Sequence, residues 1–236
     1  MKVKMLWLSL LCFALGIGNA RASIIGTTDP TQFTDPVDWC VQYGCSGQQL
    51  ATPQPWSSVA GNTGLVGLVG TQQGFYVLQQ DVTWGGNFAD HMGLIYNGSA
   101  FGNTPTDIAA TFDQGLYGAG AWIQSDYYGP FTATIDLFDS SYQLLGSFTT
   151  SGTSNNAPGT ALFIGGYIST PDVWAVQFDA TGTGPSEPDF AIGTMNLDTT
   201  SPVPEPSTLV LLGPSLLGWL AFARRRMARK PKEVLQ

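Results

Sequence analysis

The most restrictive feature of this chain is an alternation of apolar and polar residues with a period of two. Between Phe131 and Leu137 every second residue is apolar, and the residues between them are Thr132, Thr134 and Asp136. This pattern is typical of a β-strand that buries one face. Similar short runs occupy residues 65–69, 75–79, 92–96, 108–112, 118–124, 143–149, 161–168, 173–178 and 190–197. We therefore expect a mostly β protein.

The segments between these runs are rich in glycine, proline, asparagine, aspartate and serine, which favour turns. Examples are residues 97–99, 129–130, 139–141 and 183–185. Ten short strands joined by such turns predict an antiparallel two-sheet sandwich or jelly roll, and a closed barrel is the alternative. A region of about 180 residues suits one domain with a sizeable core. We place this domain at residues 23–198, before a linker rich in threonine, serine and proline.

The charge of this domain is one-sided. All nine lysines and arginines lie near the two ends of the chain, so residues 23–206 contain no basic side chain except His91. The same region holds sixteen of the seventeen acidic residues. Such a surface repels nucleic acid and anionic lipid, and it has no group that grips phosphate. Its stability must come from burial, backbone hydrogen bonds and, by hypothesis, bound cations such as Ca²⁺.

Two pairs of acidic residues in the sequence are candidates for calcium binding. Asp136 and Asp139 are close in the chain, and Ca²⁺ prefers carboxylate ligands. No EF-hand spacing surrounds them, and the alternative is that both are solvated turn residues. The acidic pair Glu187 and Asp189 is open to the same two interpretations.

The N-terminus has the composition of a secretory signal peptide. Lys2 and Lys4 precede an apolar stretch of thirteen residues at 5–17, and Ala20 and Ala22 stand at the two positions that signal peptidase checks. Cleavage after Ala22 is expected, because thirteen residues are too few to span a bilayer comfortably. A retained N-terminal anchor is the alternative.

Cysteine usage agrees with export. Removal of Cys12 with the signal peptide leaves Cys40 and Cys45, an even pair in a compartment where disulfides persist. Gly44 gives the short connection freedom to close, and so small a ring contributes about 2 kcal/mol in the chain-entropy treatment. Half of a metal site is the alternative, but no second cysteine pair and no nearby histidine completes it.

The C-terminus combines three segments in a fixed order. They are a proline-rich linker at 199–206 that ends in Pro204, Glu205 and Pro206, an uncharged run at 207–223, and a basic tail at 224–236 that begins with Arg224, Arg225 and Arg226. As a helix the run would reach about 25 Å, the short end of what a bilayer core requires. Because the basic residues follow this transmembrane helix, we expect the tail in the cytoplasm and the preceding domain outside.

This arrangement resembles the PEP-CTERM sorting signal of Gram-negative bacteria. The resemblance implies recognition by a membrane transpeptidase-like enzyme, an exosortase, which removes the tail and passes the protein toward the cell surface. The protein is then expected to be anchored in the inner membrane only transiently. Ten residues follow Arg226, which is more than this family usually carries. A plain single-pass anchor behind a proline-rich linker is the alternative.

A second resemblance covers roughly residues 84–197. It rests on residues 118–124, 128–135, 144–148, 161–165 and 189–192. These segments look like the β-sandwich ectodomain that often precedes PEP-CTERM tails, which is similar in strand pattern to galactose-binding-like jelly rolls. The matching positions are core and turn positions, so the resemblance supports the fold much more than it indicates a ligand.

Catalytic residues are scarce. His91, beside Asp90, is the single histidine, and no Gly-x-Ser-x-Gly elbow or other marked nucleophile accompanies it. We therefore expect a non-enzymatic cell-surface or extracellular-matrix protein. The alternatives are a secreted hydrolase that acts on polysaccharide through paired aspartates, and a calcium-stabilised adhesin.

Aromatic residues supply the candidate binding site. Tyr127 and Tyr128 lie in a loop signalled by Asp126 and Gly129. Exposed aromatic rings stack on sugars, while a carboxylate accepts hydrogen bonds from sugar hydroxyls. We expect the two tyrosines and Asp126 to contact extracellular polysaccharide, and burial of the tyrosines in the core is the alternative.

Overall fold

The computed structural model describes residues 24–70, 74–98, 106–182 and 189–200. The expected signal peptide, the Pro-Glu-Pro sequence, the uncharged run and the basic tail lie outside the described residues. The chain divides into two compact units, Met1–Pro202 and Val203–Gln236, and every described residue belongs to the first.

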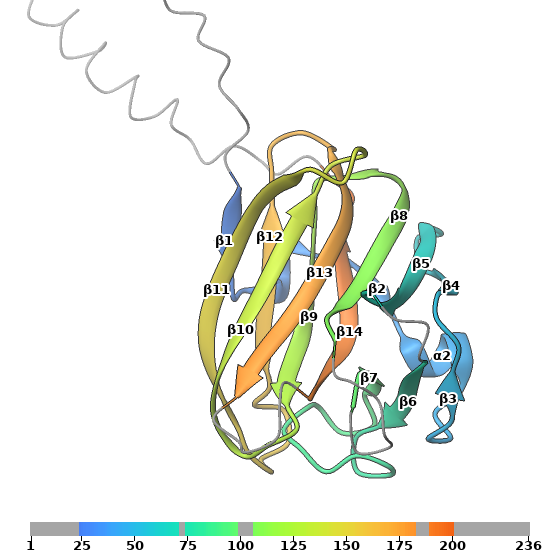
Figure 1. The fold of residues 1–236 in the computed structure, drawn as a ribbon, viewed down its shortest axis with the longest axis vertical. Coiled ribbons are helices and arrows are strands. Elements are labelled where there is room, and N and C mark those ends of the chain that lie inside the picture. Colours follow the sequence, from blue (N-terminus) through green and yellow to red (C-terminus); the bar gives the residue numbers. More distant parts are fainter. Residues whose placement is uncertain (1–23, 71–73, 99–105, 183–188, 201–236) are drawn as a thin grey trace, which may run out of the picture. The chain divides into compact units, whose positions relative to one another are not determined.

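Two sheets make up the described domain, and every ladder between their strands is antiparallel (Figure 1). The larger sheet contains, in spatial order, β1 (Ile25–Thr27), β12 (Leu162–Tyr167), β9 (Gly118–Ser125), β14 (Phe190–Asp198), β7 (Gly93–Tyr96), β6 (Phe75–Gln79) and β3 (Gln49–Leu50), with β2 (Asp35–Val37) paired to β14. The smaller sheet contains β11 (Leu144–Ser154), β10 (Gly129–Phe138), β13 (Val173–Gly182), β8 (Ile108–Leu116), β5 (Thr63–Leu68) and β4 (Gln54–Ser57).

The main hydrophobic core lies between the two sheets. The inward residues of β10 and β9, which are at most 4% exposed, are Phe131, Ala133, Ile135, Leu137, Ala119, Ala121 and Ile123. They occupy alternate positions along each strand, as the period of two predicts. The predicted two-sheet antiparallel sandwich is therefore confirmed.

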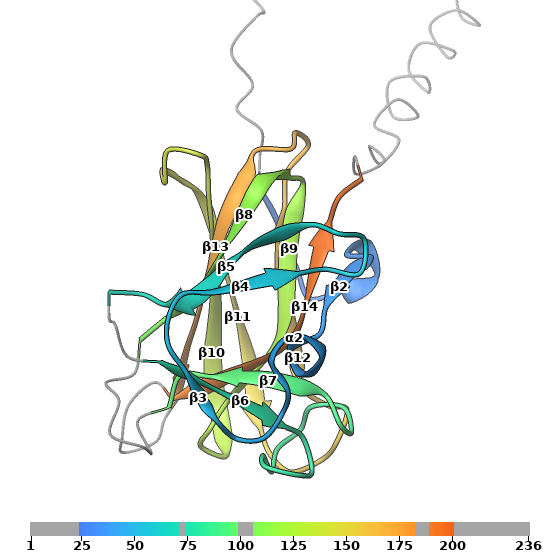
Figure 2. The same ribbon diagram turned by 90° about the vertical axis from the view of Figure 1, so that its right-hand side faces the viewer.

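All ten expected strands are present, and β8, β11 and β13 extend beyond the predicted ends. The additional elements are the short strands β1 to β4, the 3₁₀ helix η1 (Pro30–Gln32) and the helix α2 (Trp39–Tyr43). Figure 2 shows β3, β6 and β7 running steeply across the direction of the long strands.

A second apolar cluster lies on the other face of the larger sheet. Trp122 points away from Ala121 and Ile123, and its ring packs edge-on against Phe163 with centroids 5.4 Å apart. Gly120 makes room for the ring of Phe163, because a Cβ at residue 120 would lie 2.5 Å from Phe163 Cζ. The loop at residues 80–92 contributes buried rings to the same cluster.

The helix α2 is closed by a disulfide between Cys40 and Cys45, whose Cα atoms are 4.9 Å apart. The Asp38 carboxylate caps its N-terminus by accepting from the Cys40 amide at 2.8 Å. Gly44, with φ of 73°, ends the helix in a conformation that favours glycine. The helix carries Trp39, which is fully buried and donates from Nε1 to the Gly193 carbonyl at 2.7 Å. α2 is thereby fixed to β14.

Candidate functional site

The loop at residues 126–128 joins β9 to β10 and presents two tyrosines. Tyr128 is 60% exposed and Tyr127 is 36% exposed, so neither ring is packed into the core. Tyr128 Oη donates a hydrogen bond to the Gly85 carbonyl at 3.3 Å, which holds the ring beside the 80–92 loop. The loop therefore presents the ring of Tyr128 largely to solvent, whereas the ring of Tyr127 is partly covered.

Asp126, the third residue of the predicted site, already interacts within the protein. Tyr96 Oη donates to Asp126 Oδ2 at 3.0 Å. Burial raises the pKa of Asp126 and the charge of Asp189 adds to the rise, while the hydrogen bond from Tyr96 opposes it. Burial, together with the Asp126 charge, also raises the pKa of Tyr96. Part of the accepting capacity of Asp126 is therefore occupied by Tyr96.

Buried polar side chains fix the 80–92 loop behind these tyrosines. Gln124 Oε1 accepts from the Asn87 amide at 2.8 Å, and Gln124 Nε2 donates to Ser154 Oγ at 2.9 Å. Trp84 is 8% exposed, and its ring centroid lies 4.9 Å from that of Tyr96. The tryptophan therefore belongs to the packing of the loop, in contrast to the exposed Tyr128.

His91 has the environment of a turn residue. Both Asp90 and His91 are exposed, and His91 has φ of 63° just before β7. Histidine is one of the residue types that tolerates this conformation. The His91 carbonyl accepts a hydrogen bond from Gln79 Nε2 at 3.1 Å. These contacts give His91 a role in the turn.

The two aspartates of the calcium hypothesis have different environments. Asp139 Oδ1 accepts from the amides of Ser141 and Gln143 at 2.8 and 2.9 Å, so it stabilises the turn between β10 and β11. Asp136 lies within β10 and is therefore a strand residue, and its partner in register on β13 is Gln177. Over the described ranges, no group of three or more histidine, cysteine, aspartate or glutamate side chains has metal-binding geometry. Calcium binding at this pair stays a prediction.

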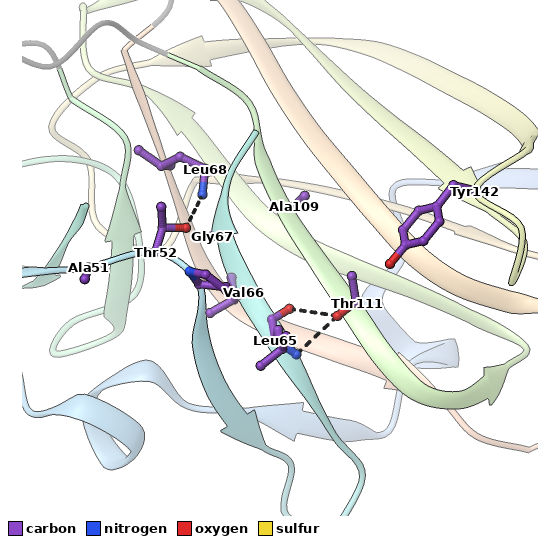
Figure 3. Close-up of a pocket in the computed structure, with 10 residues that line it drawn as sticks. Ala51, Thr52, Leu65, Val66, Gly67, Leu68, Ala109, Thr111 and Tyr142 are labelled. Carbon is purple, nitrogen blue, oxygen red and sulfur yellow. Dashed lines mark hydrogen bonds between the residues drawn. The ribbon is translucent and has the colours of Figure 1, made fainter. Parts of the chain in front are cut away.

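A groove that the sequence did not reveal lies on the outer face of the smaller sheet (Figure 3). Its larger part is a cavity of about 630 Å³, and its smaller part, of about 220 Å³, shares Ala109, Thr111 and Tyr142 with it. The larger part extends over β5 toward Thr52, and the smaller part extends over β13 toward Gln177. We call the two parts together the sheet groove.

Two rows of side chains form the floor of the sheet groove. They follow from the strand register, which places Gly67, Ala109 and Gln177 in one row and Leu65, Thr111, Ala175 and Phe138 in the other. Directly paired residues share a face of a sheet, so both rows face outward. The floor thus mixes small and apolar side chains with a threonine and an amide.

Tyr142 stands at the edge of this floor. It comes from the turn between β10 and β11, is 69% exposed, and points toward Ala109 and Thr111 (Figure 3). Its amide donates to the Asp139 carbonyl at 2.9 Å, and its φ is 57°. A non-glycine residue in the left-handed region costs about 1–2 kcal/mol, and bulky residues rarely occur there. From sequence, Tyr142 was only a residue after a predicted turn.

The C-terminal end of the chain matches a known sorting motif. Residues 202–226 match the PEP-CTERM protein-sorting motif. The chain carries a PEP-CTERM sorting signal. This signal implies an exported protein that is sorted through an exosortase, and it coincides with the Pro-Glu-Pro, uncharged and arginine segments predicted above. Within the described residues, no helix has the length and apolar character that crossing a membrane requires.

Comparisons with whole proteins add little about function. No curated protein matches the chain. Among solved structures, a DUF4465 family protein from Bacteroides caccae is similar, with 13% sequence identity over 70% of this chain and 100% of that chain and a TM-score of 0.39. A likeness at this level carries no argument about what the chain binds.

Proposed function

We propose that this PEP-CTERM chain is a non-enzymatic component of the cell surface or extracellular matrix that associates with exopolysaccharide. The PEP-CTERM sorting signal at residues 202–226 carries the proposal, because it implies export and sorting at the membrane, and an exported chain can meet extracellular polysaccharide. The exported domain contributes a sandwich with exposed aromatic side chains and no lysine or arginine.

The non-enzymatic part of the proposal is supported by the environments of the titratable side chains. The Asp139 carboxylate accepts hydrogen bonds within a turn, and the Asp126 carboxylate accepts a hydrogen bond from Tyr96. General acid–base catalysis needs a group free to exchange a proton with substrate at about 2.6–3.2 Å. A polysaccharide hydrolase is the alternative, and an activity assay separates the two.

The binding part of the proposal starts from the loop at residues 126–128. Tyr128 and Tyr127 present aromatic surface, and Asp126 lies beside them. Stacking contributes about 1 kcal/mol per ring beyond the burial of area, so a single copy would bind weakly. Display of many copies on one surface raises the effective affinity.

The sorting signal is tested by replacing Pro204, Glu205 and Pro206 with alanine in the producing cell. The variant should accumulate in the membrane fraction as a precursor that is larger by the mass of the tail. A matched control replaces Pro185, Glu187 and Pro188, a similar sequence outside the motif, and should be processed normally. Normal processing of the motif variant would count against sorting by this signal.

The molecular activity is tested with the full-length protein in a detergent that has no sugar headgroup. Binding to neutral and acidic polysaccharides is measured by titration, and release of reducing ends is measured in parallel. We expect binding without release of reducing ends. Steady release would replace this proposal by the hydrolase.

A further inference from the structure

We propose that the sheet groove binds a chain of neutral polysaccharide and that Tyr142 supplies its stacking surface. This inference rests on the proposed association with exopolysaccharide and specifies the site and the class of sugar. It concerns a surface that is separate from the loop at residues 126–128, because the groove comes from β5, β8, β13 and the turn between β10 and β11.

The shape of the sheet groove suits an extended ligand. Its larger cavity of about 630 Å³ has the size of a small-molecule site. The second cavity of about 220 Å³ continues it across β8, and Tyr142 borders both. A ligand that filled both parts would cross the strands, with its middle beneath the tyrosine ring. A linear sugar chain has this shape.

The conformation of Tyr142 gives an independent indication of function. An L-residue at φ of 57° brings its Cβ close to the following carbonyl oxygen, and glycine or asparagine normally occupies such a turn position. With 69% of its surface exposed, Tyr142 gains little from burial in return. A strained residue next to a cavity indicates that the side chain is retained for a task other than stability.

The floor of the groove offers the groups that a sugar needs. Leu65 and Ala109 provide apolar surface beneath the ring faces, and Gln177 provides an amide. Thr111 Oγ1 already accepts from the Leu65 amide at 3.3 Å and donates to the Leu65 carbonyl at 3.5 Å, so the hydroxyl offers its second lone pair as an acceptor (Figure 3). Gln177 Nε2 already donates to Asp107 Oδ2, which orients the amide and leaves its oxygen directed away from that carboxylate. Sugar hydroxyl groups both donate and accept, so they can pair with the threonine oxygen and with the amide.

The strand pairing disfavours an extended peptide in this groove. The floor strands β5, β8 and β13 each have a hydrogen-bonded neighbour on both sides. A peptide laid across them would find no free backbone groups, although strand addition depends on such groups. Sugar hydroxyls instead form hydrogen bonds with side chains, and this floor supplies such side chains.

Charge selects among polysaccharides. Asp136 lies next to Gln177 in the strand register, and Asp107 accepts a hydrogen bond from the Gln177 amide, so both carboxylates border the floor. The pKa of Asp107 is raised chiefly by burial and then by the charges of Asp179 and Asp136. The described residues contain no lysine or arginine to offset them. An anionic chain such as a polyuronate would be repelled, and a neutral chain would not.

The decisive variant is Tyr142→Gly in the full-length protein, in a detergent without a sugar headgroup. Neutral probes are a β-glucan and a galactomannan, and alginate is the anionic probe. We expect affinity for at least one neutral probe to fall about fivefold or more on loss of stacking, while the melting temperature rises because glycine relieves the strain. Loss of affinity with a gain in stability excludes damage to the fold as the cause.

Two further variants complete the test. Ala109→Phe fills the floor and should also weaken binding. The double variant Tyr127→Ala and Tyr128→Ala removes the rings of the 126–128 loop, and it should weaken binding less than Tyr142→Gly does. Loss of binding in the double variant alone would contradict binding at the sheet groove and would place the site at the 126–128 loop. Wild-type binding to no neutral probe would instead refute the association with neutral polysaccharide itself. Tighter binding of alginate, or of an apolar peptide that competes at the groove, would also overturn the proposal.

Discussion

Removal of the disulfide tests how the N-terminal part of the domain is held in place. The perturbation is the double substitution Cys40→Ser and Cys45→Ser. The two cysteines are 5 residues apart in sequence, and closure of so short a loop in the unfolded chain corresponds to about 2 kcal/mol. For a domain of this size 1 kcal/mol shifts the melting temperature by about 2–4 °C, so we expect a loss of about 4–8 °C.

The structure explains why this loss affects the whole domain. α2 has 5 residues, and an isolated helix of that length is not stable in water. It carries Trp39, whose indole is fully buried and bonded to the Gly193 carbonyl of β14. Without the disulfide, α2 is held by its Asp38 cap, by packing and by this hydrogen bond. Loosening of α2 would therefore expose part of the main core.

The assay is thermal unfolding of the exported protein with and without a reductant. The reductant should lower the melting temperature of the wild type to that of the double variant and leave the variant unchanged. The control Cys12→Ser should melt like the wild type, because Cys12 belongs to the expected signal peptide. Equal melting temperatures for wild type and double variant would refute the reasoning.

Two further predictions concern the carboxylates. The pKa values of Asp107, Asp126 and Asp179 are raised, chiefly by burial, so the folded protein holds protons that the unfolded chain releases above its aspartate pKa of about 3.9. Stability should therefore rise as the pH falls from 7 toward that value, and a falling melting temperature over this range would contradict the prediction. Asp35 is 4% exposed and accepts from Ala60 N at 2.7 Å and Asn62 Nδ2 at 2.6 Å, so Asp35→Ala should cost about 2–4 kcal/mol in urea unfolding. Asp35→Asn, which keeps an acceptor oxygen, should cost less.

The long strands could be predicted because their signal is local. In β10 the inward residues Phe131, Ala133 and Ile135 are each followed by an outward polar one, and this alternation depends only on burial of one face. The short strands β2 and β4 lack that signal, since they have 3 and 4 residues and each contains a proline. Their pairing is decided by neighbours far along the chain, such as Met195 opposite Val37. No local pattern could reveal them.

The features of the candidate sites also divide into those that consecutive residues predict and those that depend on residues far apart in the chain. The sorting signal and the exposure of Tyr128 were predictable, because motif order and turn residues are written in consecutive positions. The bond from Tyr96 to Asp126 joins residues 30 positions apart, and its effect on the predicted site was missed. The sheet groove depends on the register of four strands, which brings Gly67, Ala109 and Gln177 into one row. A single sequence does not specify that register.

In the proposed function, binding at the sheet groove depends on the number of copies that the sorting signal brings together. A shallow groove with one principal ring gives a weak complex, because stacking contributes only about 1 kcal/mol and part of the binding free energy is spent on ordering the ligand. Many copies on one surface convert successive contacts with a long polysaccharide into events at high effective concentration. The PEP-CTERM signal at residues 202–226 implies export and sorting at the membrane, and in the proposed function it would bring all copies to the same surface. A domain with no lysine or arginine keeps those copies apart through repulsion, so the surface stays open to a neutral polymer.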